Sequence, residues 1–339
     1  MPSLTEAQKQ AQKQRDDKGL EMSLERLHIP NVTFGCKVMQ VRGKGQGVRS
    51  IMHIPRGGPV LAEAALFSVD NVRDPLTDHN KSSIWRHADE NPQFRDLASK
   101  DDQPSDESRF QTNNFEISVT SRNGHTYGIF FKASRFNHSC IPNAYFAWNP
   151  ELEGGKGQLT IYAIQDIPAY DEILINYRKG DCYMRKDARQ AELNNHYGFV
   201  CGCPACLRRP GHEFGAGSDA RRVRMRTLEA SIIRSTNLNT PRARGAKRQN
   251  INELIHNLKQ EGSIYPQLAD ALEELGKIAH KELSLARDQR DKSAAAYESY
   301  CHDSALQIAR DKLDLDVCCT GFRSPVVMKA LEFIRSLDR

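Results

Sequence analysis

The chain has 339 residues, of which 39% are hydrophobic and 27% charged, a composition typical of a soluble globular protein with two domains. No apolar run approaches the length of a membrane span, and the polar amino-terminal residues exclude a secretory signal peptide. The formal charge is +5, and the nine cysteines predict reduced thiols or a metal site rather than disulfides. We therefore expect an intracellular protein, in the cytoplasm, the nucleus or both, without membrane contact.

The amino-terminal half is predicted to be rich in strands. Residues 1–30 are polar and predict a tail or a frayed helix. Residues 31–178 carry short apolar runs broken by Gly and Pro, which indicates strands and turns. Within them, residues 70–110 are polar and acidic and predict an inserted surface element, partly helical and partly loose. Asn123 and Gly124 predict the turn of a hairpin.

The carboxyl-terminal half is predicted to be helical. Residues 179–210 contain a helical stretch at 185–196 and then closely spaced cysteines. Over residues 215–339 the apolar side chains recur at the helical period. Two successive helical faces illustrate this period: Ile251, Leu254, Ile255 and Leu258, then Leu268, Leu272, Leu275 and Ile278. The fold class is therefore predicted to be α+β, a β-rich domain followed by an all-α carboxyl-terminal region.

Three cysteines lie within six residues, at Cys201, Cys203 and Cys206. Zinc takes four tetrahedral ligands, and a tight turn presents several thiolates at such a spacing. The fourth ligand has several candidates: Cys36, Cys140, Cys182 and His196. Three unrelated buried cysteines are one alternative to a zinc site. A redox Cys-x-x-Cys motif is another, although such a motif is expected to open a helix after a strand.

Polar groups are concentrated in the segment Arg135-Phe-Asn-His-Ser-Cys-Ile-Pro-Asn143, between two apolar stretches. One interpretation is a nucleophilic pair formed by His138 and Cys140. Another is that His138 is a hydrogen-bonded histidine of the core, which would be the better interpretation of an isolated histidine. Tyr177 ends an apolar strand further along, and by itself it would be an ordinary strand tyrosine.

Taken together in this order, the Asn-His-Ser-Cys-x-Pro-Asn motif at 137–143, the strand Asp171–Tyr177 and the cysteines at 201–206 resemble the SET-domain protein lysine methyltransferases. Two upstream segments, Gly43–Gly47 and Thr112–Phe115, are similar to further motifs of that family. The glycines alone are a weak signal, and without Gly-Lys-Ser/Thr they do not predict a phosphate-binding loop.

The resemblance spans residues 32–206. It is greatest to the branch that carries a MYND zinc finger within the SET domain and a helical carboxyl-terminal region. Residues 48–112 contain no cysteine, so we expect no MYND finger here. The resemblance implies a SET domain at 31–178, a post-SET zinc-binding segment at 179–210, and transfer of a methyl group from S-adenosylmethionine to a lysine of a protein substrate.

The resemblance also implies roles for individual residues. Tyr177 matches the catalytic tyrosine, and Tyr197 an aromatic residue of the channel for the substrate lysine. Cys140 becomes the fourth ligand of a structural zinc ion. The positions implied to hold the cofactor are Lys44, Gln46, Asn113, Ser134, Asn137, His138, Tyr177 and Phe199.

The positive charge is concentrated in residues 219–248, which hold nine Lys or Arg against two acids. This stretch predicts contact with an acidic partner or with nucleic acid, or else a solvated helix followed by a loop. Without interleaved aromatic residues, the stretch does not resemble a base-stacking surface.

Two other functions are alternatives to the enzyme. One is a catalytically inactive SET-fold scaffold that binds partner proteins through its helices, and the other is a zinc-stabilised nucleic-acid-binding protein.

Overall fold

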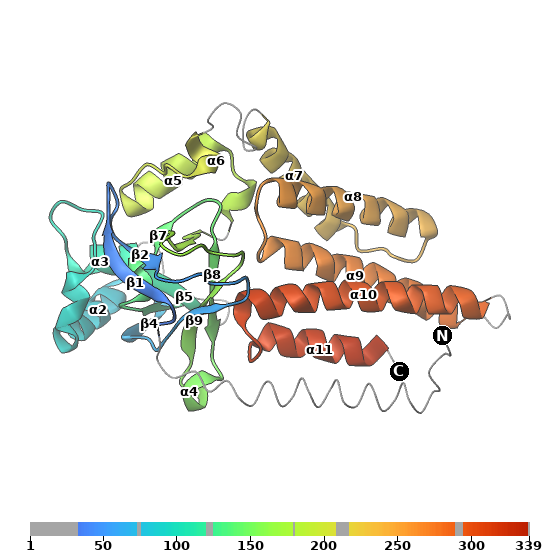
Figure 1. Cartoon of the computed structure of the whole chain (residues 1–339), viewed down its shortest axis with the longest axis horizontal. Coiled ribbons are helices and arrows are strands. Elements are labelled where there is room, and N and C mark those ends of the chain that lie inside the picture. The colour runs from blue at the N-terminus through green and yellow to red at the C-terminus, as the bar shows by residue number, and fades with distance from the viewer. Residues whose placement is uncertain are drawn as a thin grey trace.

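The computed structural model describes residues 33–72, 76–119, 125–178, 180–207, 217–288 and 294–337. The predicted amino-terminal tail and the predicted turn at Asn123 and Gly124 lie outside these ranges. A strand-rich part is followed by long helices stacked beside it (Figure 1). In the described ranges, no helix is both long and apolar enough to span a membrane.

The strands form several small sheets. In chain order they are β1 (Cys36–Val41), β2 (Gly45–Ser50), β3 (Pro59–Glu63), β4 (Phe67–Val72), β5 (Asn114–Val119), β6 (His125–Ile129), β7 (Asn137–His138), β8 (Ala144–Asn149), β9 (Gln158–Ala163) and β10 (Leu174–Ile175). β1 pairs with β2, the order β3-β9-β8 forms one three-stranded sheet, and β4-β6-β5 forms another. β7 and β10 pair in parallel, which brings the Asn-His motif beside the strand that precedes Tyr177.

The core of the strand-rich part is built from strands whose side chains are buried on both faces. β9 is the central strand of its sheet, and nearly all of its side chains are buried, Ile161 completely. Its neighbour β8 carries Phe146, which packs edge-on against Phe115 of β5. β8 was not expected from the sequence, because its burial depends on β9 and α10 rather than on an alternating pattern of its own.

The insertion predicted at 70–110 is helical in part, and it also has a core of its own. It contains α2 (Asp78–Glu90), η1 (Pro92–Asp96) and α3 (Asp106–Asn113), with Thr77 and Ser105 as N-caps. These elements pack on the β4-β6-β5 sheet through apolar side chains: Phe67, Val69, Ile84, Phe94 and Phe110. The helical part of the insertion is therefore packed against the sheet, whereas residues 98–105 between η1 and α3 have no regular secondary structure.

The remaining elements are helical, and the predicted α+β class is confirmed. Two short helices are η3 (Ala133–Arg135) and α4 (Leu152–Gly155). They are followed by η4 (Asp181–Tyr183), α5 (Lys186–Tyr197), α6 (Pro204–Leu207), α7 (Ser218–Arg234), α8 (Pro241–Gln260), α9 (Gln267–Arg287), α10 (Ala294–Thr320) and α11 (Pro325–Leu337). The predicted faces point inward, since Ile251, Leu254 and Ile278 are buried in one cluster.

The helices α9 and α10 pack against the β8 and β9 side of the strand-rich part (Figure 1). Ile164, directly after β9, shares a buried cluster with Leu315 and Cys319 of α10. The rings of Tyr145 and Tyr265 meet edge to face, with centroids 4.6 Å apart. The two halves of the chain therefore share a hydrophobic core.

The basic stretch at 219–248 is not a free cationic surface. Its second segment, PRARGAKR, opens α8 with Thr240 as N-cap, so the loop expected there is wrong. Six of its nine basic side chains pair with acids of the helical region: Arg221 and Arg222 with Glu261, Arg224 with Glu253, Arg244 and Arg248 with Glu282, and Lys247 with Glu274. The expected acidic partner or nucleic acid therefore has no support from the structure.

Candidate active site and cysteine centre

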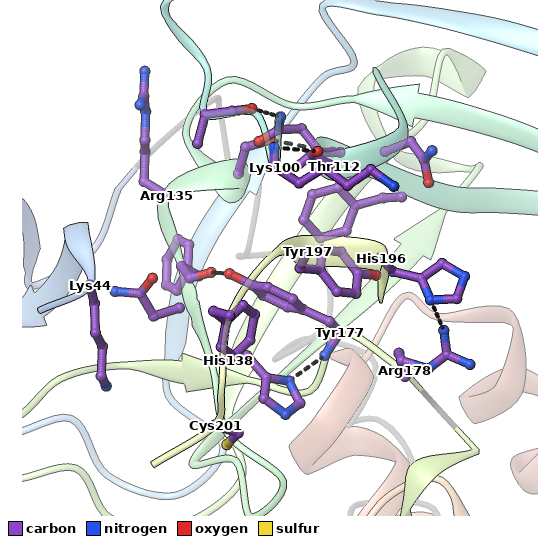
Figure 2. Close-up of a pocket in the computed structure, with 18 of the residues that line it drawn as sticks. Lys44, Lys100, Thr112, Arg135, His138, Tyr177, Arg178, His196, Tyr197 and Cys201 are labelled. Atoms are coloured by element: carbon purple, nitrogen blue, oxygen red, sulfur yellow. Dashed lines mark hydrogen bonds between the residues drawn. The ribbon is translucent and has the colours of Figure 1, made fainter. Parts of the chain in front are cut away.

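A cavity of about 1830 Å³ lies between the strand-rich core, the insertion and the segment that follows α5. The nine residues predicted to contact cofactor or substrate all line it: Lys44, Gln46, Asn113, Ser134, Asn137, His138, Tyr177, Tyr197 and Phe199. Figure 2 shows how Tyr177, Tyr197 and His138 gather at its centre, with Lys44 and Lys100 on different sides. The fold thus brings together residues that lie up to 155 positions apart in the chain.

Tyr177 is held at both its backbone and its hydroxyl group. Its N–H donates to Nδ1 of His138 at 3.1 Å, and its hydroxyl donates to the carbonyl oxygen of Phe136 at 2.7 Å (Figure 2). Burial raises the pKa of Tyr177 above its ordinary value. The phenol therefore stays protonated at neutral pH, which suits an orienting and electrostatic role better than that of a general base.

Aromatic rings surround this tyrosine. The ring of Tyr197 lies 4.9 Å from that of Tyr177, centroid to centroid, and the ring of Phe199 lies 5.9 Å from that of His138. Tyr197 ends α5, and Gly198 adopts the left-handed conformation (φ 73°) that terminates the helix. The chain turns at this glycine, so both Tyr197 and Phe199 line the same cavity.

One acidic residue organises the wall that the glycine segment forms. Glu172 accepts a hydrogen bond from Lys44 Nζ at 2.6 Å and another from Asn137 Nδ2 at 2.8 Å. Asn137 Nδ2 also lies 3.2 Å from the carbonyl oxygen of Gln46. Glu172 was not expected as a site residue from the sequence, because its partner Lys44 lies 128 positions earlier in the chain.

Asn113 and Ser134 are fastened to each other and to the insertion. Asn113 Nδ2 donates to the carbonyl oxygens of Ala98, at 2.7 Å, and Arg109, at 2.8 Å. Ser134 Oγ donates to the carbonyl oxygen of Asn113 at 3.4 Å. The side-chain amide of Asn113 therefore ties the end of α3 to the preceding loop, and its N–H groups are already engaged.

Four buried cysteines form a compact centre at the edge of the cavity, which Cys201 and Cys203 help to line. The sulfurs of Cys140, Cys201, Cys203 and Cys206 all lie within 4.8 Å of one another. Cys140 Sγ is 3.6 Å from the sulfur of Cys206 and 4.0 Å from that of Cys201. Sulfurs around a tetrahedral zinc ion would be about 3.8 Å apart, for a Zn–S distance of about 2.3 Å. The donor set therefore fits a closed four-thiolate metal site, with Cys140 as the fourth ligand.

The other candidates for the fourth ligand lie elsewhere. Cys36 donates to the carbonyl oxygen of Val60 in the core of the strand-rich part. The carbonyl of Cys182 accepts from Arg222, and His196 lies beside Glu192. Cysteines outside the centre are buried free thiols, as predicted: Cys36, Cys182, Cys301, Cys318 and Cys319.

His138 lies between the cysteine centre and Tyr177. Its Nδ1 accepts from the backbone of Tyr177, and its Nε2 is 3.4 Å from Cys140 Sγ. Loss of solvation on burial lowers the pKa of His138 to about 4, so the ring is neutral at physiological pH. The structure favours a hydrogen-bonded histidine over a nucleophilic pair, because the Cys140 thiol is buried among three other thiols.

Residues 45–178 match the SET domain family, and this part of the chain is a SET domain. The SET domain predicted from the sequence motifs is therefore confirmed for these residues. The match covers β2 to β10, with Tyr177 and Cys140. Outside it lie β1, the cavity residues Lys44, Tyr197 and Phe199, and the other three cysteines.

Several similar proteins have methyltransferase names. The chain is 31% identical over 179 residues to Histone-lysine N-methyltransferase set5 of Schizosaccharomyces pombe, and the aligned stretch covers 52% of this chain and 52% of that protein. It is 35% identical to Histone-lysine N-methyltransferase ASHR2 of Arabidopsis thaliana, over 26% of this chain and 22% of that protein. It is 40% identical to human Protein-lysine N-trimethyltransferase SMYD5, over 24% of this chain and 18% of that protein. The chain thus matches about half of the fission yeast protein and about a fifth of the other two.

Proposed function

We propose that this protein is an S-adenosylmethionine-dependent methyltransferase that modifies a lysine side chain of a protein substrate. The observation that carries the proposal is the cavity itself: the nine residues that match cofactor and substrate positions of the SET family line one space, with the Tyr177 phenol among aromatic rings. The names of the similar proteins support the same reaction.

The reaction requires a neutral amine. A free lysine is neutral about once in 2,500 molecules at pH 7, which costs roughly 4.6 kcal/mol. The aromatic rings of Tyr177 and Tyr197 would desolvate the amine in the channel and lower its pKa. Proximity would supply much of the remaining acceleration, because the attack on carbon must be in line with the bond to sulfur.

S-adenosylmethionine, when bound, supplies a methyl group on a positively charged sulfur. Lys44, Gln46, Asn137 and Ser134 are proposed to hold its polar amino acid end, and Phe199 to cover its adenine. The Tyr177 hydroxyl and the Phe136 carbonyl are hydrogen-bonded to each other, and their oxygen atoms would stabilise the transferring methyl group. The substrate ammonium would first lose a proton to water. As the neutral nitrogen bonds to the methyl carbon, the C–S bond would break and the positive charge would pass from sulfur to nitrogen.

The substrate class follows from the reaction: a protein with an accessible lysine. Since two of the similar proteins are named histone-lysine methyltransferases, histones are one candidate substrate. We also propose that the protein acts in the nucleus or the cytoplasm. Zinc in the cysteine centre is proposed to be structural, because four thiolates leave no open coordination position.

Transfer of tritiated methyl groups from S-adenosylmethionine to an array of proteins would test the proposal. We expect label on lysine, cofactor binding by calorimetry, and a loss of about a hundredfold in turnover for Tyr177→Phe with unchanged cofactor affinity. Tyr170→Phe is the matched control, since that side chain is 72% exposed and lies outside the cavity. Cofactor binding without transfer to any protein would favour the inactive scaffold, and full turnover by Tyr177→Phe would contradict the role of this tyrosine.

A further inference from the structure

Arg189, on the inner face of α5, lies against the cysteine centre and is completely buried. We infer that Arg189 is a positioning residue of this centre: its guanidinium balances the negative charge of the metal–thiolate cluster and fixes α5 to it. The inference concerns metal retention, and it does not depend on the proposed methyl transfer.

The contacts of Arg189 include a sulfur but no carboxylate. Nη1 donates to the carbonyl oxygen of Met184 at 2.6 Å. Nη2 donates to the carbonyl oxygen of Ala205 at 3.5 Å and to Cys206 Sγ at 3.6 Å. Within the described residues, Arg189 forms no ion pair with Asp or Glu, and its Nε has no hydrogen-bond partner.

A buried guanidinium without an anion is costly, because it loses its hydration and gains no opposite charge in return. Four neutral thiols would not supply that charge. Four thiolates around a divalent cation carry a net charge of −2, and they lie directly at the guanidinium. The position of Arg189 is therefore explained when the cysteines are ionised and hold a metal.

A second hydrogen-bond donor, His138 of β7, contacts the cysteine centre at Cys140. His138 Nδ1 accepts the N–H of Tyr177, so the proton of the neutral ring is on Nε2, which lies 3.4 Å from Cys140 Sγ. Donors that bond to ligand atoms in this way orient the ligands and tune their affinity for the metal. The cluster is thereby connected to α5 through Arg189 and to the backbone of Tyr177 through His138.

The cysteine centre also holds the segment of the chain that forms one side of the cavity. Gln190, the next residue on α5, exchanges two hydrogen bonds with the backbone of Cys201, at 2.7 and 2.8 Å. The segment between α5 and Cys201 contains Tyr197 and Phe199, which line the cavity. Losing the contact between Arg189 and the cluster should loosen α5 from the metal centre and weaken metal retention.

The test compares metal release from purified full-length variants. Arg189→Met keeps much of the volume of the side chain but removes its charge. Arg189→Lys keeps the charge but replaces the planar guanidinium group, with its several N–H donors, by an ammonium group. Arg222→Met is the matched control, since Arg222 is equally buried but bonds Glu261 instead of a sulfur. Bound zinc is counted by mass spectrometry, and its transfer to a coloured chelator is followed over time.

We expect zinc release from Arg189→Met to be faster by about tenfold or more, Arg189→Lys to be intermediate, and Arg222→Met to release zinc at the wild-type rate despite lower stability. Substitution by cobalt(II) adds a spectroscopic test, because the sulfur-to-metal charge-transfer band should shift in Arg189→Lys. The band of Arg189→Lys can be measured even if the Arg189→Met variant does not fold.

Three results would overturn the inference. The first is a wild-type protein that retains neither zinc nor cobalt. The second is equal release from Arg189→Met and Arg222→Met, and the third is an Arg189→Lys variant with wild-type release and an unshifted cobalt spectrum. None of these readouts involves methyl transfer, so failure of this inference and failure of the proposed enzyme are distinguishable.

Discussion

The carboxylate of Glu172 lies between two side chains of the cavity wall, 2.6 Å from Lys44 Nζ and 2.8 Å from Asn137 Nδ2. Lys44 belongs to the turn between β1 and β2, Asn137 to β7, and Glu172 to the chain just before β10. One acid thus fastens three segments that are distant in sequence. Its own side chain is only 13% exposed, whereas that of Lys44 is 43% exposed.

Replacing this acid should weaken cofactor binding. In Glu172→Gln the charge that holds the Lys44 ammonium is lost, and we expect the Kd for S-adenosylmethionine to rise about tenfold, which corresponds to about 1.4 kcal/mol. Calorimetry measures this change. Glu298→Gln breaks an exposed ion pair with Arg287, far along the chain, and should leave the affinity unchanged. Equal affinities for the two variants would contradict the role of Glu172.

Gly47 lies where a side chain has no room. A Cβ atom there would come within 2.6 Å of both Asn137 Nδ2 and Val41 Cγ2. We therefore expect Gly47→Ala to displace Asn137 and to abolish cofactor binding. Gly245→Ala is the control, because its Cβ would meet nothing within 4 Å in α8. This second change should raise the free energy of unfolding by about 0.5–1 kcal/mol, measured by denaturant titration. Cofactor affinity that survives in Gly47→Ala would show that the wall adapts.

Alkaline pH should destabilise the folded protein through buried tyrosines. Burial raises the pKa of Tyr145, Tyr177, Tyr183 and Tyr265, so their phenols keep protons that an unfolded chain releases near pH 10. Above about pH 10 the unfolded state binds fewer protons than the folded state, and the free energy of unfolding must fall as pH rises. Phenolate absorbance and circular dichroism, followed together, check this.

We expect part of the phenolate absorbance to appear only with the loss of helical signal, and the dependence on pH to become shallower in Tyr145→Phe. Complete tyrosine ionisation while the helices persist would contradict the burial argument.

Glu261 joins α7 to the end of α8 and is completely buried. It accepts hydrogen bonds from Ser218 Oγ, Arg221 Nε and Arg222 Nε. Glu261→Ala leaves the buried Arg222 without its anion, so we expect a loss of about 3–5 kcal/mol in the free energy of unfolding.

Denaturant unfolding of full-length protein measures this loss, and Glu253→Ala, which removes an exposed partner of Arg224, provides the comparison with little expected change. A small effect of Glu261→Ala would mean that water reaches the guanidinium group.

Features carried by neighbouring residues could be predicted from the sequence, and features carried by distant partners could not. The helical period predicted α8 and α9, and the residues singled out by contiguous motifs lie around one cavity. Glu172 was missed because its importance comes from Lys44, which lies 128 positions earlier in the chain. No local pattern indicates such a pairing.

The basic stretch illustrates the same limit. Its charges look free in the sequence, because the acids that neutralise them lie on other turns and helices, as Glu274 does for Lys247 and Glu282 for Arg248. The strand β8 was missed for a related reason: its burial depends on β9 and α10 rather than on its own alternation. The core of the insertion likewise depends on the sheet beneath it.

The shared core of the two halves has a consequence for experiments on shortened chains. Ile164 is buried against Leu315 and Cys319, and Tyr145 against Tyr265. A fragment that ends before α9 would expose this apolar face to water and is expected to aggregate, even though it contains every residue of the cavity. Substitutions in α10 can therefore abolish activity without touching the site, and the carboxyl-terminal helices should be kept in any variant whose chemistry is to be measured.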